Sequence, residues 1–280
     1  MAKIAVIGIC GRSVFMPVDH FHNPGETVVA KELAYELGGK GFNQAIAAAR
    51  MGAEVSFLAA MGDDEITDEC EAVLKVDGIK SYIIRKPGQK SAIAFILTDK
   101  DGENRVTEYE DAKLSVEDVL TYEKEISESE FLMIQNEVPE EVNDKALEFA
   151  AKYGVKVIYN PAPARESTST KNFRYYVGTP NEHERAFCDE GRFDNYIITL
   201  GKNGCLVNGK TEIPAIDVKP VDTTGAGDTF NGYLAACLLE GMEVELAAKY
   251  AVAASGLSVS KKYVVGAIPY REEVEKILNK

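Results

Sequence analysis

Short apolar runs alternate with longer segments of helical periodicity along most of the chain, and the two patterns predict different elements. The run from Lys3 to Ile9 is apolar and rich in β-branched residues, which is typical of a strand buried on both faces. Similar runs predict strands at 54–60, 131–135, 155–159, 175–178 and 196–200, and periodic segments predict helices at 43–51, 66–76, 115–127, 139–153, 227–241, 244–260 and 271–278. This alternation implies an α/β fold with a mostly parallel sheet covered by helices.

Two stretches break the alternation, because each combines extended, β-rich sequence with turn signals. The first, residues 11–37, contains Pro24-Gly25 and the run Thr27–Ala30. The second, residues 88–111, has a hairpin signal at Asp101-Gly102. We expect both stretches to join in one small β-sheet that projects from a single domain, residues 1–280, as a lid.

The segment around which the chain is organised runs from Asp222 to Asp228, with the sequence Asp-Thr-Thr-Gly-Ala-Gly-Asp. It lies at the mouth of the predicted helix 227–241, where backbone N–H groups lack intrahelical partners and glycines let an anion approach closely. A carboxylate repels a bound phosphate, so a carboxylate at this position indicates a chemical role. The base that takes the proton from an attacking hydroxyl is such a role. The alternative is a tight turn into a buried helix, with Asp228 only as a partner of the helix dipole.

A second glycine-rich segment, Gly38-Gly39-Lys40-Gly41-Phe42-Asn43-Gln44, opens the predicted helix 43–51. Its glycines let the backbone approach a ligand, while Lys40 and Asn43 offer hydrogen-bond donors; the alternative is a flexible turn that caps the helix. Glu137 follows the strand 131–135 directly, at the strand end where parallel sheets bind ligands. This carboxylate either accepts hydrogen bonds from ligand hydroxyls or caps the helix that follows it.

Composition narrows the class of partner. The formal charge of −14 at pH 7 argues against nucleic acid or an anionic membrane, so an anionic ligand must be held by local groups. The five cysteines show no paired spacing, which indicates reduced thiols in a cytoplasmic protein. The apolar N-terminal run is too short for a signal peptide or a membrane span. Residues 8–13 lack the G-x-G-x-x-G fingerprint, which disfavours an NAD-binding oxidoreductase.

The stretch from Asp222 to Phe230 resembles the C-terminal signature of the ribokinase-like (PfkB) carbohydrate kinases. The segments 24–27, 38–41 and 62–64 are similar to the ribokinase branch of that family at matching spacing, and the resemblance extends over nearly the whole chain. It implies a ribokinase-like three-layer α/β sandwich with a small β-sheet lid over the sugar. It also implies a homodimer formed through the lids and transfer of the γ-phosphoryl group of ATP to a hydroxyl of a small sugar.

The resemblance assigns roles to matching positions. Asp228 would be the base, and the N–H groups of Gly225, Ala226 and Gly227 would hold charge on the phosphoryl oxygens. The implied sugar contacts are Gly11, Ser13, Gly39, Lys40, Gly41, Asn43 and Glu137, and the implied ATP contacts are Asn181, Glu184, Thr199, Gly201, Lys202, Gly204 and Gly227. Glu184 would also organise Mg²⁺ through water, and K⁺ would be bound, mainly by carbonyls, at Asp222, Thr224, Ser258, Lys261, Tyr263 and Ala267.

Two departures from the family pattern concern the cation and the acceptor. Tyr263 stands where a glycine is usual in the cation site, and Gly11-Arg12-Ser13 stands where an N-x-D element grips the sugar hydroxyls. We therefore expect phosphoryl transfer with ribose as a poor or secondary acceptor, and another polyol, sugar or nucleoside as the alternative. A different alternative is a catalytically weakened sugar- or nucleotide-binding regulatory protein, against which the intact Asp228 argues.

Overall fold

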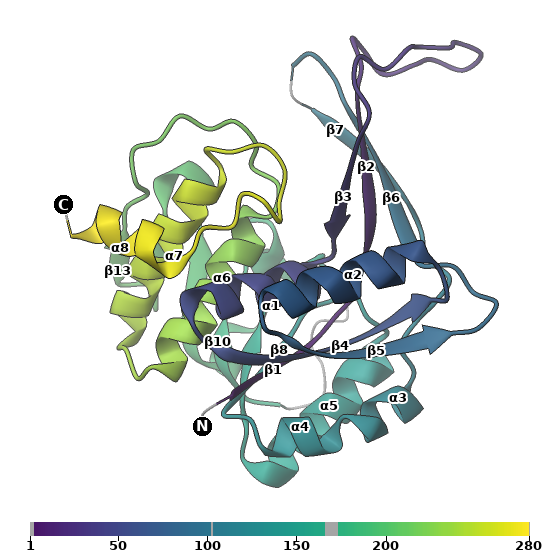
Figure 1. Cartoon of the computed structure of the whole chain (residues 1–280). Helices are drawn as coiled ribbons and strands as arrows, with labels where there is room; N and C mark the ends of the chain where they lie inside the picture. The colour runs from purple at the N-terminus through teal and green to yellow at the C-terminus, as the bar shows by residue number, and fades with distance from the viewer. Residues whose placement is uncertain (1–2, 102, 166–172, 280) are drawn as a thin grey trace.

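A nine-stranded sheet forms the middle layer of the protein (Figure 1). This computed structural model describes residues 3–101, 103–165 and 173–279. The strands pair in parallel except at one edge, where the pairs β11–β12 and β12–β13 are antiparallel. Across the sheet the order is β13 (Thr211–Ile213), β12 (Cys205–Val207), β11 (Phe193–Thr199), β10 (Tyr175–Gly178), β9 (Lys156–Tyr159), β8 (Phe131–Ile134), β1 (Lys3–Ile7), β4 (Glu54–Gly62) and β5 (Lys80–Lys86).

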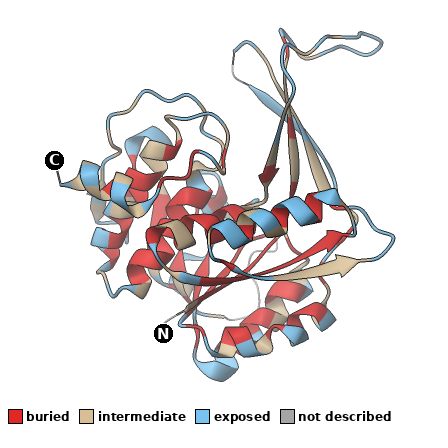
Figure 2. Cartoon of the chain, in the orientation of Figure 1, coloured by how far each residue is buried: buried red, intermediate tan, exposed pale blue. Residues whose placement is uncertain are grey.

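Helices cover both faces of this sheet, which confirms the predicted three-layer α/β architecture. Ile4 and Val6 of β1 lie in one hydrophobic cluster and Ala5 and Ile7 in the other, so the strand packs against a helical layer on each of its two faces. Figure 2 shows the buried residues concentrated between the layers. One cluster contains residues of α1 (Lys40–Met51), α2 (Glu65–Val76), α6 (Ala226–Leu239), α7 (Val244–Ser258) and α8 (Arg271–Leu278), and the other contains residues of α3 (Val116–Thr121), α4 (Glu123–Ser127) and α5 (Glu140–Tyr153).

A four-stranded sheet, here called the lid, stands out from the main body (Figure 1). Its strands β2 and β6 pair in parallel, while the two outer pairs are antiparallel. The two β-rich stretches that interrupt the helix–strand alternation therefore join in one sheet, as predicted. The strand order of the lid is β3 (Ala34–Gly38), β2 (Gly11–Pro17), β6 (Ala92–Thr98) and β7 (Asn104–Tyr109).

Three details of the secondary-structure prediction were wrong. The run Thr27–Ala30 belongs to the irregular loop between β2 and β3 rather than to a strand. The predicted helix 115–127 is divided at Tyr122 into α3 and α4; the Tyr122 ring is fully buried and its hydroxyl donates to Ser56 Oγ at 2.6 Å. Strands β5 and β12 were not predicted, since β5 is at most half-buried and polar at both ends and β12 has only three residues.

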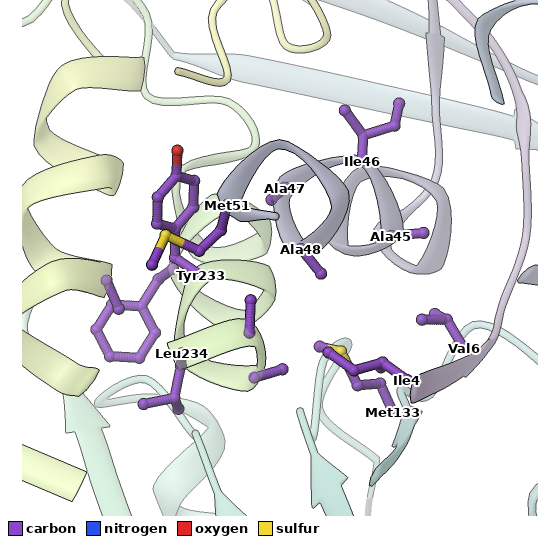
Figure 3. Packing of buried hydrophobic residues seen from close by; sticks show 14 of the residues in the cluster. Ile4, Val6, Ala45, Ile46, Ala47, Ala48, Met51, Met133, Tyr233 and Leu234 are labelled. Carbon is purple, nitrogen blue, oxygen red and sulfur yellow. The ribbon is translucent and has the colours of Figure 1, made fainter. Parts of the chain in front are cut away.

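Helices α1 and α6 pack with their backbones unusually close. A Cβ atom at Gly232 of α6 would lie 2.4 Å from the carbonyl oxygen of Gln44 and 2.5 Å from Ala47 Cβ, so only glycine fits. Figure 3 shows alanines of α1 in the same buried cluster as Tyr233 and Leu234 of α6. Because each helix begins in a glycine-rich segment, this packing also brings the two predicted ligand-binding segments together.

The cysteines are unpaired and mostly buried. All five cysteines are free, and all but Cys188 are buried. Burial raises the pKa of the Cys205 and Cys237 thiols to about 12, so they remain protonated and unreactive. Within the described residues, no helix is long and apolar enough to cross a membrane.

Candidate active site

Asp228 lies in the first turn of α6 and is buried beside α1. The helix begins at Ala226, after Gly225, whose φ of 73° is one that residues with side chains rarely adopt. The Asp228 carboxylate accepts hydrogen bonds from Asn43 Nδ2 at 2.9 Å and from Gln44 Nε2 at 3.1 Å. The two glycine-rich segments therefore meet at this carboxylate, and each of its oxygens is held by an amide from α1.

The start of α6 is open and presents backbone donors. The first N–H groups of a helix have no partner within the helix, and a Cβ built on Gly227 would meet no atom within 4 Å. The Ala226 N–H donates to the Thr223 carbonyl just before the helix at 3.3 Å. Asn231 steadies this turn from inside, because its Nδ2 donates to the Gly227 carbonyl at 2.8 Å while its Oδ1 accepts from Thr179 Oγ1 at 2.5 Å. The resulting row of N–H groups, next to the Asp228 carboxylate, can receive an anionic oxygen.

A buried amide network fixes the orientation of Gln44. Gln135 Nε2 donates to Gln44 Oε1 at 2.8 Å, which leaves the Gln44 amide nitrogen to donate both to Asp228 and to Asn160 Oδ1 at 3.1 Å. Gln135 and Asn160 directly follow β8 and β9, so the central sheet itself positions the catalytic candidate. Neither Gln44 nor Gln135 was predicted as a site residue, although both are uncharged polar residues beside apolar runs that become buried.

Asn43 presents an unused acceptor to the site. Its Nδ2 binds Asp228, but its Oδ1 is one of three buried side-chain nitrogen or oxygen atoms that have no hydrogen-bond partner among the described residues. Buried polar atoms are normally paired, because an unpaired one costs about 1–3 kcal/mol. A ligand hydroxyl that donates to this oxygen would remove the cost, which supports the predicted role of Asn43 in holding a polyhydroxylated ligand.

Glu137 binds the start of α1 and does not cap the helix that follows it. Its Oε2 accepts the Lys40 backbone N–H at 2.6 Å, whereas the residue before α5 is Pro139, with no side-chain cap. Burial raises the pKa of the Glu137 carboxyl to about 7, opposed by the Lys40 ammonium and reinforced by the Asp228 carboxylate. The pKa of the Lys40 ammonium is raised in turn, chiefly by Asp228 and then by Glu137.

Gly39 and Gly41 are required by the close approach of α1 to the end of β1. Gly39 has a φ of 123°, and a Cβ there would lie 2.3 Å from the Ile9 carbonyl oxygen. A Cβ on Gly41 would lie 2.6 Å from Gly8 Cα. Both glycines thus let the backbone of α1 begin directly against the sheet, next to Lys40 and Asn43.

The lid strand β2 offers little polar chemistry to the site. A Cβ on Gly11 would lie 2.5 Å from the Ala92 carbonyl oxygen and 2.9 Å from Ala92 Cβ, so no side chain can be placed there without moving β6. Arg12 points away, because its guanidinium donates to Glu69 of α2 at 2.7 Å. Among Gly11, Arg12 and Ser13, only Ser13 therefore has a polar side chain on the face of β2 that looks onto the site.

The predicted nucleotide residues lie beyond the carboxyl ends of β10 and β11. Asn181 Oδ1 accepts the N–H groups of His183 and Glu184, and Glu184 Oε2 accepts the Asn181 N–H at 2.9 Å. Thr199 lies beside them, since its N–H donates to the Pro180 carbonyl at 2.9 Å. Burial raises the pKa of the Glu184 carboxyl, and this buried, already hydrogen-bonded group suits contact with Mg²⁺ through water.

The turn after Thr199 is tight and glycine-dependent. Gly201 and Gly204 have φ values of 53° and 89°, and the Gly204 carbonyl accepts the Leu200 N–H at 2.8 Å. A Cβ on Gly204 would lie 1.9 Å from the Ile213 carbonyl oxygen. Lys202, between the two glycines, is exposed at the surface.

The positions predicted to bind a monovalent cation gather in the turn between α7 and α8 and in the segment before α6. Asp222 accepts the Thr224 N–H at 2.9 Å and the Tyr263 N–H at 3.1 Å, which ties the two segments together. Tyr263 has a φ of 68°, so it keeps a backbone conformation that glycine favours. The other three members of the set are Ser258 and Ala267, which are buried, and Lys261, whose ammonium pairs with Glu273 at 3.2 Å.

The Tyr263 side chain reaches the lid. Its hydroxyl lies 3.2 Å from Glu32 Oε1, and its ring centroid lies 5.9 Å from that of Phe15 on β2. Glu36 of β3 reinforces this bridge by accepting backbone N–H groups from residues 264 and 265. A cavity of about 320 Å³ lies beneath the contact, lined by lid residues and by the segment 220–224.

The raised pKa of Glu137 predicts how stability depends on pH. Between the ordinary pKa of a glutamate and about 7, the folded protein holds a proton that the unfolded chain releases, so this group lowers the free energy of unfolding as pH rises. Glu137→Gln removes the titration and should therefore gain stability over the natural protein between about pH 5 and about pH 8 in urea denaturation. Glu141→Gln, an exposed change on α5, is the matched control. Equal pH dependence for the natural protein and Glu137→Gln would contradict the assignment.

The comparisons with known proteins agree with this arrangement. The pfkB family of carbohydrate kinases matches residues 1–270. The chain is 34% identical to the ribokinase of Bacillus subtilis (strain 168), with all of both chains covered. It is 36% identical to the ribokinase of Lactococcus lactis subsp. lactis (strain IL1403), with 98% of this chain and 96% of that protein covered.

A solved structure extends the similarity to three dimensions. The crystal structure of ribokinase from Thermotoga maritima superimposes with a TM-score of 0.87 at 34% identity, with all of both chains covered. The match includes the lid as well as the central sheet, since no part of either chain is left out. The chain therefore belongs to the pfkB family of carbohydrate kinases.

Proposed function

We propose that the protein transfers the γ-phosphoryl group of ATP to a hydroxyl of a pentose-sized sugar, with Asp228 as the general base. The observation that carries this proposal is the Asp228 carboxylate itself. It is buried, its oxygens are positioned by Asn43 and Gln44, and it adjoins the open N–H groups at the start of α6. A purely structural carboxylate at a helix start would need neither the buried amide network nor the open glycines.

The chain's own groups supply positioning and charge stabilisation. A sugar hydroxyl beside Asp228 would pass its proton to the carboxylate as its oxygen bonds to the γ-phosphorus and the bond to the ADP oxygen breaks. The N–H groups of Gly225, Ala226 and Gly227 would stabilise charge on the phosphoryl oxygens. The Lys40 ammonium, which interacts electrostatically with Asp228, would hold a further phosphoryl oxygen.

Mg²⁺ is part of the proposal as the ion that neutralises the ATP phosphates when bound. Glu184 would hold it through water. In the described part of the chain, no group of three or more His, Cys, Asp or Glu side chains could bind a metal directly. This favours an ion held mainly by phosphate oxygens and water over one held in a carboxylate cage.

Replacing the base tests the mechanism. Asp228→Asn keeps the shape but removes the proton acceptor, so kcat should fall by roughly 10²–10⁴-fold while ATP binding persists. The variant should fold, because the Asn43 amide can rotate to present its unpaired Oδ1 to the new amide. Asp63→Asn, which alters a surface carboxylate paired with Arg85, is the control. Turnover within a few-fold of the natural protein, measured with an ADP-coupled assay, would exclude Asp228 as the base.

The cation prediction concerns the loop that forms the anion site. We propose that K⁺ binds among the carbonyls around Asp222 and orders the segment from Asp222 to Gly227. Turnover with Mg²⁺ should then be higher in K⁺ than in Na⁺ of equal concentration, because a carbonyl cage suits the larger and more weakly hydrated ion. Steady-state rates in desalted protein give the comparison. Identical rates in the two salts would remove this site from the mechanism.

A homodimer through the lid is supported by apolar side chains on the outer surface of the lid. Tyr35, Phe95 and Tyr109 are 59%, 42% and 51% exposed, which is unusual for large aromatic residues gathered on one small sheet. A second copy of the lid would cover them. Sedimentation equilibrium at micromolar protein should give a dimer, and Phe95→Lys should shift it toward monomer. A natural protein that sediments as a 30.6 kDa monomer would contradict the proposal.

A further inference from the structure

The lid carries a carboxylate on its site-facing surface that the sequence motifs did not indicate. Ser13 of β2 pairs with Ala94 of β6, and Ala94 pairs with Glu108 of β7. Residues directly opposite one another on paired strands project from the same face of a sheet, so Glu108 lies on the same face as Ser13. Only the short side chain of Ala94 separates them.

This face of the lid looks onto the main body. Phe15 and Ile96, which lie two residues beyond Ser13 and Ala94 and so on the same face, line the cavity together with Asp222. In agreement, the Glu108 carboxylate contributes to raising the pKa of both the Lys40 ammonium and the Glu137 carboxyl, which lie on the main body. Both are predicted acceptor contacts. Glu108 therefore faces across the site toward them, although it comes from a strand that has no residue in any motif considered above.

Glu108 is exposed and available, whereas the other carboxylate in the same row is not. Glu36, which pairs with Ser13 from the opposite side, accepts backbone N–H groups of residues 264 and 265 and so holds the lid to the main body. Within the described residues, Glu108 has no hydrogen-bond or ion-pair partner. A carboxylate in this state can accept two hydrogen bonds from a ligand without giving up a contact in the protein.

We propose that Glu108 is a specificity-determining residue that accepts hydrogen bonds from secondary hydroxyls of the acceptor sugar. This inference rests on the proposed sugar kinase function and names the lid residue that recognises the acceptor. Glu108 supplies a carboxylate that β2 cannot offer, because Gly11 has no room for a side chain and Ser13 carries only a hydroxyl. The contact orients the sugar from the lid, while Asp228 deprotonates the reacting hydroxyl from the main body.

Glu108→Gln tests the role, with Glu103→Gln as the matched control on the same hairpin. A hydrogen bond to a charged group is worth about 1.5–3 kcal/mol, so the loss should weaken ribose binding by roughly 10–150-fold. Calorimetry with a non-hydrolysable ATP analogue measures it. In turnover, KM for the sugar should rise, whereas kcat at saturating sugar and KM for ATP should stay within about threefold. Glu108→Asp should recover part of the affinity, and Glu103→Gln should bind as the natural protein does.

Deoxy sugars locate the contact. With 2-deoxyribose or 3-deoxyribose, whichever lacks the hydroxyl bound by Glu108, the effect of Glu108→Gln on affinity should largely disappear. Equal ribose affinity for the natural protein and Glu108→Gln would overturn the role of Glu108 and leave the kinase function standing. A fall in kcat without a change in sugar affinity would also overturn it. Failure of the natural protein to bind any pentose would overturn the proposed acceptor class, and the role of Glu108 with it.

Discussion

The close packing of α1 on α6 is the constraint on which the site depends. With no side chain at Gly232, the two helix backbones approach closely enough for Asn43 and Gln44 to reach the Asp228 carboxylate. These hydrogen bonds lie in a buried, low-dielectric environment, where a misplaced donor would leave a charge unpaired. A wider helix spacing would therefore change the chemistry of the carboxylate before it changed the fold.

The charge balance of the site follows from this geometry. Lys40 lies within electrostatic reach of four carboxylates, those of Asp228, Glu137, Glu184 and Glu108, and each of them raises its pKa. Bringing an anionic nucleotide into such surroundings is costly unless fixed dipoles compensate. The helix start supplies them as backbone N–H groups, which carry partial positive charge and need no counter-ion. An acidic chain of net charge −14 can thereby hold phosphate groups without a basic surface.

How far the sequence predicted this structure depends on how local each feature is. The sheet and helix pattern, the lid stretches and the two glycine-rich helix starts could be anticipated, because periodicity and glycine-rich turns are encoded within a few residues. The meeting of Asp228 with Asn43 was not predicted, since the two residues lie 185 positions apart in the sequence. The break at Tyr122 could not be anticipated, since no glycine or proline in residues 116–127 marks it. Glu108 was also missed, because only strand pairing shows which way its side chain projects.

The glycines at the base of the site cannot be substituted, whereas positions on the lid can. Any side chain at Gly8, Gly39 or Gly41 would collide with backbone, so these positions are closed to substitution whatever the ligand. The lid strand β7, in contrast, presents exposed side chains along its whole length, which can be exchanged without disturbing a core. Substitutions that change the acceptor during evolution would therefore be expected in the lid. The glycines at the base of the site would be expected to stay unchanged.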